Sequence, residues 1–122
     1  MLRLGYPVIG VVDIERAVAF WSAALNLEPK PSWSTERWRT LRHVERGDEV
    51  LGLQLSESPV EPYPRVHIDL FVDSRAEQDA EIERLVGLGA RKLDWRRYPT
   101  DPDFVVLADP DDNPFCIVDR SR

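Results

Sequence analysis

The chain of 122 residues has the length of one domain that can bury a sizeable core. Its 43% hydrophobic and 31% charged residues are ordinary for a globular protein, and no apolar run approaches the roughly 20 residues that span a bilayer. A net charge of −6 argues against nucleic-acid binding. The single cysteine excludes an internal disulfide and fits a reducing compartment, so we expect a cytoplasmic protein without a secretory signal.

The first half of the chain predicts a strand, a helix and a β-rich stretch. Val8 to Val12 form a short β-branched apolar run, which is typical of a buried strand, and Asp13 is a good N-cap for a helix. Apolar residues then recur at helical spacing, and we expect Pro29 and Pro31 to stop that helix. The β-rich segment 33–55 follows, with a turn signal at residues 46–48.

The second half repeats this order. Residues 66–72 alternate apolar and polar side chains, as a strand does, and Ser74 with Glu77 matches a capping box at the start of a helix. Gly89 is placed to cap the C-terminus of that helix. Three further strands are expected, at residues 91–95, 104–108 and 115–118.

The spacing of the two strand-to-helix junctions indicates an internal duplication. Val12-Asp13 and Val72-Asp73 are 60 positions apart, which is close to half of the chain. We therefore predict one domain of two modules, about 1–56 and about 64–122. The intervening linker, about 57–63, is rich in proline and polar residues.

Three segments resemble the vicinal oxygen chelate superfamily, which contains glyoxalases, bleomycin resistance proteins and dioxygenases. They are RAVAFWSAALNL, PRVHIDLFVD with its following helix, and FVVLADPDDNPFCIVD, and the glyoxalase-like domain subgroup is the nearest. The resemblance implies an α+β fold in which two βαβββ modules form a cupped eight-stranded mixed sheet, with helices on the convex side. It also implies a concave small-molecule pocket and a homodimer. Asp112 stands where the family usually has glycine, and Asp tolerates a left-handed backbone better than most residues.

Strand alternation separates the residues of the predicted pocket from those of the core. The apolar residues of strand 66–72 should face a helix, which leaves His67 and Asp69 on the concave face. Their Cα atoms should be about 6.6 Å apart, so we expect a water or ligand to bridge the two side chains. Trp33 or Trp38 is a candidate for the pocket mouth. The predicted ligand-pocket residues are Tyr6, Gln54, His67, Asp69, Phe71 and Cys116.

The family's metal ligands fall on residues that are mostly poor ligands here. The resemblance places them at Tyr6, at Gly52 or Gln54, at His67 and at Cys116, and only His67 is a usual ligand. The sequence therefore argues against a metal-dependent glyoxalase, and we predict no cofactor. A divalent ion at His67 is the alternative.

The leading functional hypothesis is metal-independent binding or sequestration of an apolar or aromatic small molecule. The alternative is an enzyme of the lyase, isomerase or dioxygenase class with His67 as its catalytic residue. In that enzyme His67 acts either as a general base or as a metal ligand together with Gln54 or Asp69. We expect Cys116 to be a small buried side chain rather than an activated thiol. A dimerising accessory module without a ligand is a third possibility.

Overall fold

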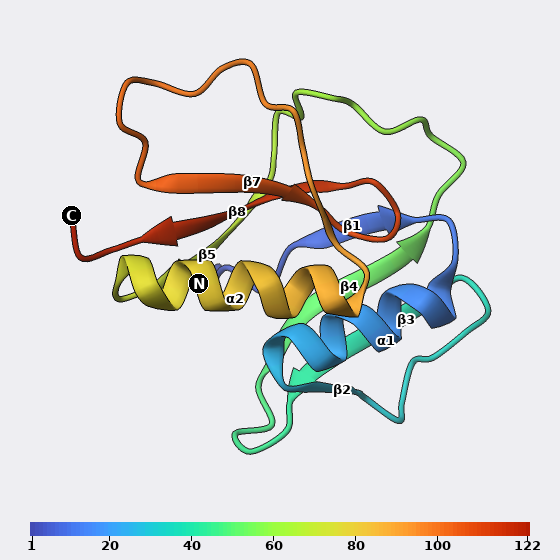
Figure 1. The fold of residues 1–122 in the computed structure, drawn as a ribbon. Helices are drawn as coiled ribbons and strands as arrows, with labels where there is room; N and C mark the ends of the chain where they lie inside the picture. Colours follow the sequence, from blue (N-terminus) through green and yellow to red (C-terminus); the bar gives the residue numbers. More distant parts are fainter. The chain divides into compact units, whose positions relative to one another are not determined.

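Each half of the chain folds into one helix and four strands in the same order (Figure 1). The computed structural model describes residues 1–122, which divide into the units Met1–Pro59 and Val60–Arg122. Both units follow the βαβββ order, so the predicted α+β class and the duplication are confirmed. Hydrogen bonds join the strands into two mixed four-stranded sheets, one in each unit. A single cup of eight strands stays a prediction.

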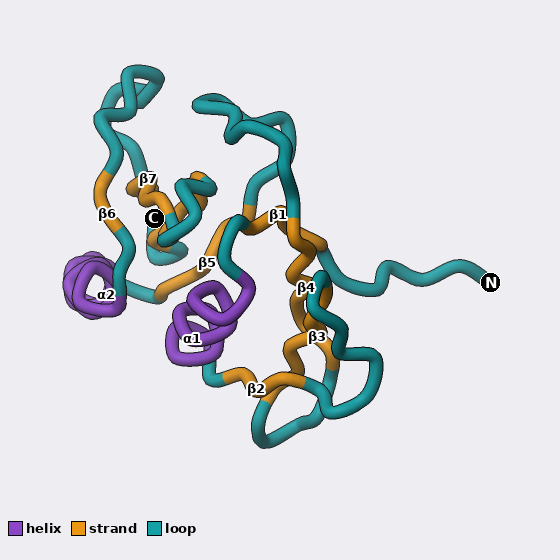
Figure 2. The backbone as a smooth tube through the Cα atoms, turned by 90° about the vertical axis from the view of Figure 1, so that its right-hand side faces the viewer, coloured by secondary structure: helices purple, strands orange, loops and turns teal.

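The first unit is a sheet of order β1-β4-β3-β2 in which β1 runs parallel to β4 and the other neighbours are antiparallel. The helix α1 contacts β2, β3 and β4. The tube in Figure 2 shows the chain before β1 running away from these strands as a loop. The elements are β1 (Val8–Val11), α1 (Ile14–Leu25), β2 (Leu27–Pro29), β3 (Trp38–His43) and β4 (Glu49–Leu55).

Local hydrogen bonds set the ends of α1. The Asp13 carboxylate accepts a hydrogen bond from the Arg16 N–H at 3.1 Å, as an N-cap does. The helix ends at Asn26, whose backbone is left-handed with a φ of 56° and whose N–H donates to the Ser22 carbonyl. The prediction that Pro29 stops the helix was therefore wrong. Asn26 ends it earlier, and Pro29 closes the short strand β2, where its missing N–H is tolerated.

The second unit repeats this arrangement with the order β5-β8-β7-β6, and β5 is parallel to β8. The helix α2 contacts β5, β6 and β8. No helix in the structure combines the length and apolar character needed to cross a membrane. The elements are β5 (Ile68–Val72), α2 (Arg75–Leu88), β6 (Arg91–Lys92), β7 (Phe104–Ala108) and β8 (Pro114–Asp119).

Both predicted caps of α2 are present. The Ser74 hydroxyl accepts from the Glu77 N–H at 3.1 Å, and the Glu77 carboxylate accepts from the Asp73 N–H at 2.8 Å. Gly89 caps the other end with a φ of 123°, a backbone region that glycine adopts most easily. One face of α2 also buries Gln78, whose amide donates to the carbonyls of Asp103 and Ile117 at 3.1 and 2.9 Å.

The strand predicted at 91–95 is much shorter in the structure. Only Arg91–Lys92 pairs as β6, and one further bond runs from the Leu93 N–H to the Val106 carbonyl at 3.2 Å. Beyond it the chain leaves the sheet as a long loop to β7, visible in Figure 2, in which Asp101 has a left-handed φ of 52°. The turn before β8 holds Asp112 at a φ of 68°, as the sequence led us to expect.

Candidate ligand pocket

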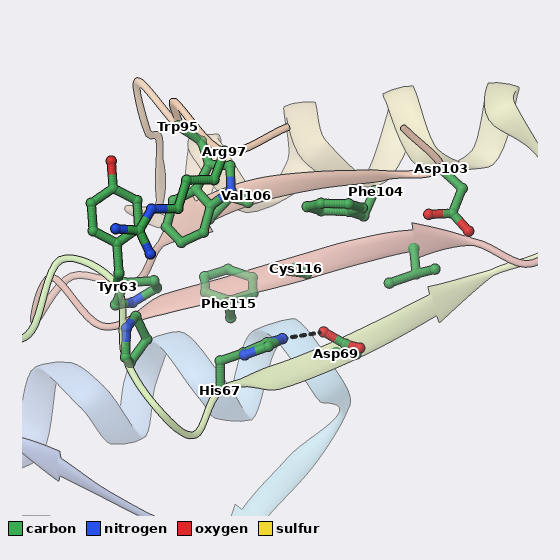
Figure 3. Close-up of a pocket in the computed structure, with 13 residues that line it drawn as sticks. Tyr63, His67, Asp69, Trp95, Arg97, Asp103, Phe104, Val106, Phe115 and Cys116 are labelled. Atoms are coloured by element: carbon green, nitrogen blue, oxygen red, sulfur yellow. Dashed lines mark ion pairs between the residues drawn. The ribbon is translucent and has the colours of Figure 1, made fainter. Parts of the chain in front are cut away.

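The second unit contains a cavity of about 530 Å³ that opens on one face of its sheet. This volume lies within the range of sites that hold small molecules. The cavity is lined by residues between Tyr63 and Val118, all from the second unit. Strands β7 and β8 with the first residues of β5 supply the floor, and the loops before β5 and before β7 supply the rim (Figure 3).

The register of the sheet explains which side chains reach the cavity. Asp69 on β5 and Val106 on β7 both pair with Cys116 on β8, so these three residues form one row across the sheet. Side chains two residues apart on a strand share a face, which adds Phe104 from β7 and Val118 from β8. The same alternation led us to expect His67, Asp69 and Cys116 on one face.

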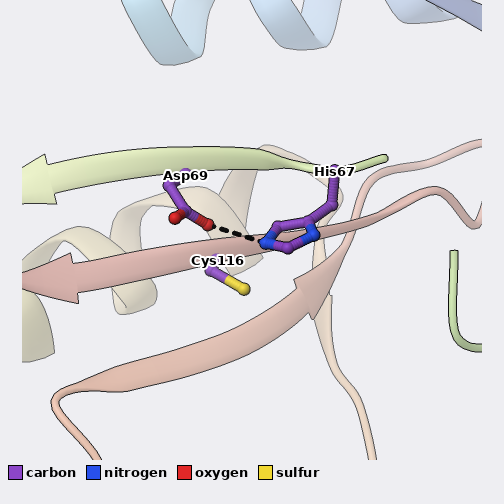
Figure 4. A group of neighbouring side chains, drawn as sticks. All are labelled: His67, Asp69 and Cys116. Atoms are coloured by element: carbon purple, nitrogen blue, oxygen red, sulfur yellow. Dashed lines mark ion pairs between the residues drawn. The ribbon is translucent and has the colours of Figure 1, made fainter. Parts of the chain in front are cut away.

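Three polar or nucleophilic side chains converge on this floor (Figure 4). The His67 Nε2 atom lies 3.0 Å from the Asp69 Oδ1 atom, and one ligand atom each of His67, Asp69 and Cys116 lies within 4.8 Å of the others. The expectation that a bridge must join His67 to Asp69 was wrong. The Cα spacing limits the backbone only, and the two side chains lean along the strand until their tips meet.

Cys116 is a protonated thiol in this setting. Its side chain is only 8% exposed, and burial raises the pKa of the thiol from 9.0 to about 12, with further contributions from the charge of Asp69 and a hydrogen bond to it. A thiol needs to lose its proton to act as a nucleophile. The geometry therefore supports the interpretation of Cys116 as a packed, unactivated side chain.

The rim of the cavity is aromatic. The rings of Tyr63 and Trp95 lie 4.8 Å apart between centroids, and the guanidinium of Arg97 lies 3.8 Å above the Tyr63 ring (Figure 3). The rings of Tyr98 and Phe104 lie 5.3 Å apart between centroids, and the Tyr98 hydroxyl accepts a hydrogen bond from the Val106 N–H at 2.8 Å. Sequence reasoning missed the rim, because Tyr63 lies in the predicted linker and the segment around Trp95 was expected to be a regular strand.

The remaining predicted pocket residues lie elsewhere in the two units. Tyr6 and Gln54 belong to the first unit, where Tyr6 is half-buried beside Gly52 and Gln54 is exposed on β4. Phe71 belongs to the second unit but does not line the cavity. It is 61% exposed, with the guanidinium of Arg120 4.6 Å above its ring. A contribution of these three residues to a ligand site stays a prediction.

The first unit has no side chain at Gly52, one of the two positions on β4 where the family resemblance places a metal ligand. A Cβ atom at Gly52 would lie 2.8 Å from Trp38 Cη2 and 3.0 Å from Tyr6 Cε2, so aromatic rings fill the space where a ligand side chain would stand. Trp33, the other candidate for the pocket mouth, is 78% exposed in the same unit. In the second unit the group of His67, Asp69 and Cys116 could hold a metal ion. The family's four-strand ligand set, however, does not fit these residues.

The repeated βαβββ modules and the cavity on a sheet face are those of the vicinal oxygen chelate fold. This chain belongs to the glyoxalase-like domain family, whose sequence profile matches residues 7–118. The search of curated proteins found no match.

Several solved structures are similar to this chain along nearly its whole length. A glyoxalase/bleomycin resistance protein/dioxygenase family enzyme from Burkholderia phytofirmans PsJN is 20% identical with a TM-score of 0.72, covering 97% of this chain and 98% of that chain. Protein ATC0852 from Agrobacterium tumefaciens is 20% identical with a TM-score of 0.71, covering 98% of each chain. A mutant of the fosfomycin resistance protein FosX from Listeria monocytogenes is 21% identical with a TM-score of 0.72, covering 97% of this chain and 90% of that chain. Its structure is a complex with Mn(II) and 1S,2S-dihydroxypropylphosphonic acid. At these identities the similarity shows the fold alone.

Proposed function

We propose that the cavity of the second unit binds a small molecule with an apolar or aromatic body, and that it does so without a metal ion. The observation that carries the proposal is a cavity of about 530 Å³ with an aromatic rim and a few converging polar groups on its floor. Most small-molecule sites combine apolar walls with a small number of polar groups that fix the ligand's orientation. Binding or sequestration needs nothing beyond this arrangement.

The donor chemistry supports the metal-independent form of the proposal. Gly52 has no side chain, and Trp38 and Tyr6 cover it. The Cys116 thiol keeps its proton at neutral pH because it is buried next to the Asp69 carboxylate. The first unit therefore offers no donor at Gly52, and the second unit offers a protonated thiol at Cys116.

Ligand binding can be tested with a library of planar aromatic compounds. Compounds that fill the cavity should raise the melting temperature of the protein, because a ligand that binds only the folded state stabilises it. The Trp95→Ala variant should weaken binding, since Trp95 forms part of the rim. Trp33→Ala is the matched control, because it removes the same ring from an exposed position in the first unit. Binding that both variants weaken equally, or neither weakens, would contradict the proposed site.

A second candidate function is catalysis, and the 3.0 Å contact between His67 and Asp69 favours it. In the tautomer protonated at Nε2, that N–H donates a hydrogen bond to the Asp69 carboxylate, and the Nδ1 atom of His67 is left as a base beside the cavity. A metal-dependent version would place a divalent ion on His67, Asp69 and Cys116. The FosX structure contains Mn(II), so a metal ion is compatible with this fold.

Elemental analysis separates these candidates. Protein purified without chelators, and protein reloaded with Ni²⁺, Zn²⁺, Mn²⁺ or Fe²⁺, should contain no stoichiometric metal if the pocket is metal-independent. Near-stoichiometric metal that is absent from a His67→Ala variant would instead support the metal-dependent enzyme. Turnover of a ligand found in the screen, abolished by His67→Ala in metal-free protein, would support the general-base enzyme.

A further inference from the structure

We propose that the pocket selects ligands with opposite charges at their two ends. A cationic group would lie against Asp103, an anionic group against Arg97, and a flat aromatic body between them. The inference rests on the proposed binding function and names the class of ligand. Its evidence is the uneven distribution of charge around the cavity.

The acidic end of the cavity is formed by Asp103, which directly precedes β7. The Asp103 side chain forms no ion pair, although its backbone carbonyl is fixed by bonds from the Gln78 amide at 3.1 Å and from the Asp119 N–H at 2.7 Å. An unpaired carboxylate at a cavity wall favours a cationic group or several N–H donors.

Arg97 is the only Arg or Lys that lines the cavity. Its neighbours along the chain, Arg91 and Arg96, face Asp112 at 2.7 Å and Asp94 at 3.8 Å, whereas Arg97 forms no ion pair. Its guanidinium instead lies 3.8 Å above the ring of Tyr63. Stacking occupies the face of the guanidinium and leaves its N–H donors at the edge, where a carboxylate or phosphonate can accept two hydrogen bonds.

The two ends are separated across the cavity. Figure 3 shows Arg97 near Tyr63 and Trp95 at one end, Asp103 at the other, and the Phe104 ring between them. A compact ion would therefore reach one end only. A ligand that reaches both ends and covers the Phe104 ring has a flat apolar body. The cavity is large enough for a ring system with two short substituents.

The test uses benzene and naphthalene probes that carry an aminomethyl group, a carboxylate, both groups on opposite sides, or a neutral hydroxymethyl group. Affinities are measured by calorimetry on the full chain at low and physiological salt. Probes with both groups should bind most tightly. The Asp103→Asn variant should weaken every amine-bearing probe about five- to tenfold and leave the carboxylate-only probe unaffected. Arg97→Gln should weaken the carboxylate-bearing probes by a similar factor.

Two variants with the same charge changes serve as controls. Asp94→Asn and Arg96→Gln alter exposed neighbours that do not line the cavity, so affinities should stay within twofold of the unaltered protein. Equal binding of charged and neutral probes, or equal effects of Arg97→Gln and Arg96→Gln, would overturn the charge selection while leaving aromatic binding intact. Failure of every probe to bind, the neutral ones included, would overturn the binding function as well.

Discussion

The thiol of Cys116 should react far more slowly in the folded protein than in the unfolded chain. Burial, the charge of Asp69 and a hydrogen bond to Asp69 raise its pKa from 9.0 to about 12. At pH 8 this rise in pKa lowers the fraction of thiolate about 1000-fold, because a pKa higher by one lowers the ratio of thiolate to thiol tenfold. This loss is partly offset, because a thiolate whose pKa is higher by this amount is about 20-fold more nucleophilic. The two effects together predict disulfide exchange about 50-fold slower, before any steric protection.

The measurement is the rate of reaction with 4,4′-dithiodipyridine at pH 8, with and without urea. The Asp69→Asn variant should react several-fold faster than the unaltered protein when both are folded, because it removes the charge that raises the thiol pKa. Asp103→Asn is the matched control, since it removes the same charge elsewhere on the cavity wall. A folded protein that reacts within threefold of the unfolded chain would refute the reasoning.

The same shift has a consequence for stability at high pH. An unfolded cysteine loses its proton near pH 9, whereas the folded thiol keeps it up to about pH 12. The contribution of Cys116 to stability is therefore fully present below pH 9 and is lost as the pH rises toward 12. Cys116→Ala should remove this part of the pH dependence in urea unfolding. An unchanged slope between pH 9 and 10.5 would show that the thiol does not cause it.

Three further predictions concern packing and assembly. Gly52→Ala should destabilise the fold by about 1–3 kcal/mol in urea unfolding, because the alanine methyl group would displace the rings of Trp38 and Tyr6. An unchanged unfolding midpoint would contradict this close packing. Gln78→Glu should cost about 3 kcal/mol at pH 7, since a buried carboxylate would face two carbonyl oxygens. That loss should shrink as the pH falls and the introduced carboxyl gains a proton, so equal losses at pH 7 and pH 5 would count against it. We expect the homodimer that the family resemblance implies, and light scattering that shows only monomers at high concentration would exclude it.

The elements that local sequence specifies were predicted well. Strand alternation and helix caps depend only on neighbouring residues. The structure contains the alternation around His67, the N-caps Asp13 and Ser74, and the C-cap Gly89. The strand Phe104–Ala108 was placed at its observed bounds, since its apolar run ends at a dense turn signal. The short strand β2 was missed, because three residues carry too little pattern to be distinguished from a loop.

The candidate site was predictable only in its floor. Alternation placed His67, Asp69 and Cys116 on one face, but their contact depends on the pairing of β5 with β8, nearly 50 positions apart. Trp95 and Arg97 lie on a loop that leaves the sheet after β6, so strand alternation says nothing of their direction. The contact of Arg97 with Tyr63 joins two loops, and no local pattern encodes such a pairing.

The two modules have used equivalent positions in opposite ways. On the last strand of the first unit, Gly52 lies under Trp38 and Tyr6, whereas on the last strand of the second, Cys116 lies beside Asp69 on an open cavity floor. Each unit has its own sheet and helix, so tolerance to mutation should differ between the two halves. Substitutions around Gly52 should mainly lower stability, and those around Cys116 should mainly change the choice of ligand. The same βαβββ scaffold therefore carries a close-packed strand in one unit and an open cavity floor in the other.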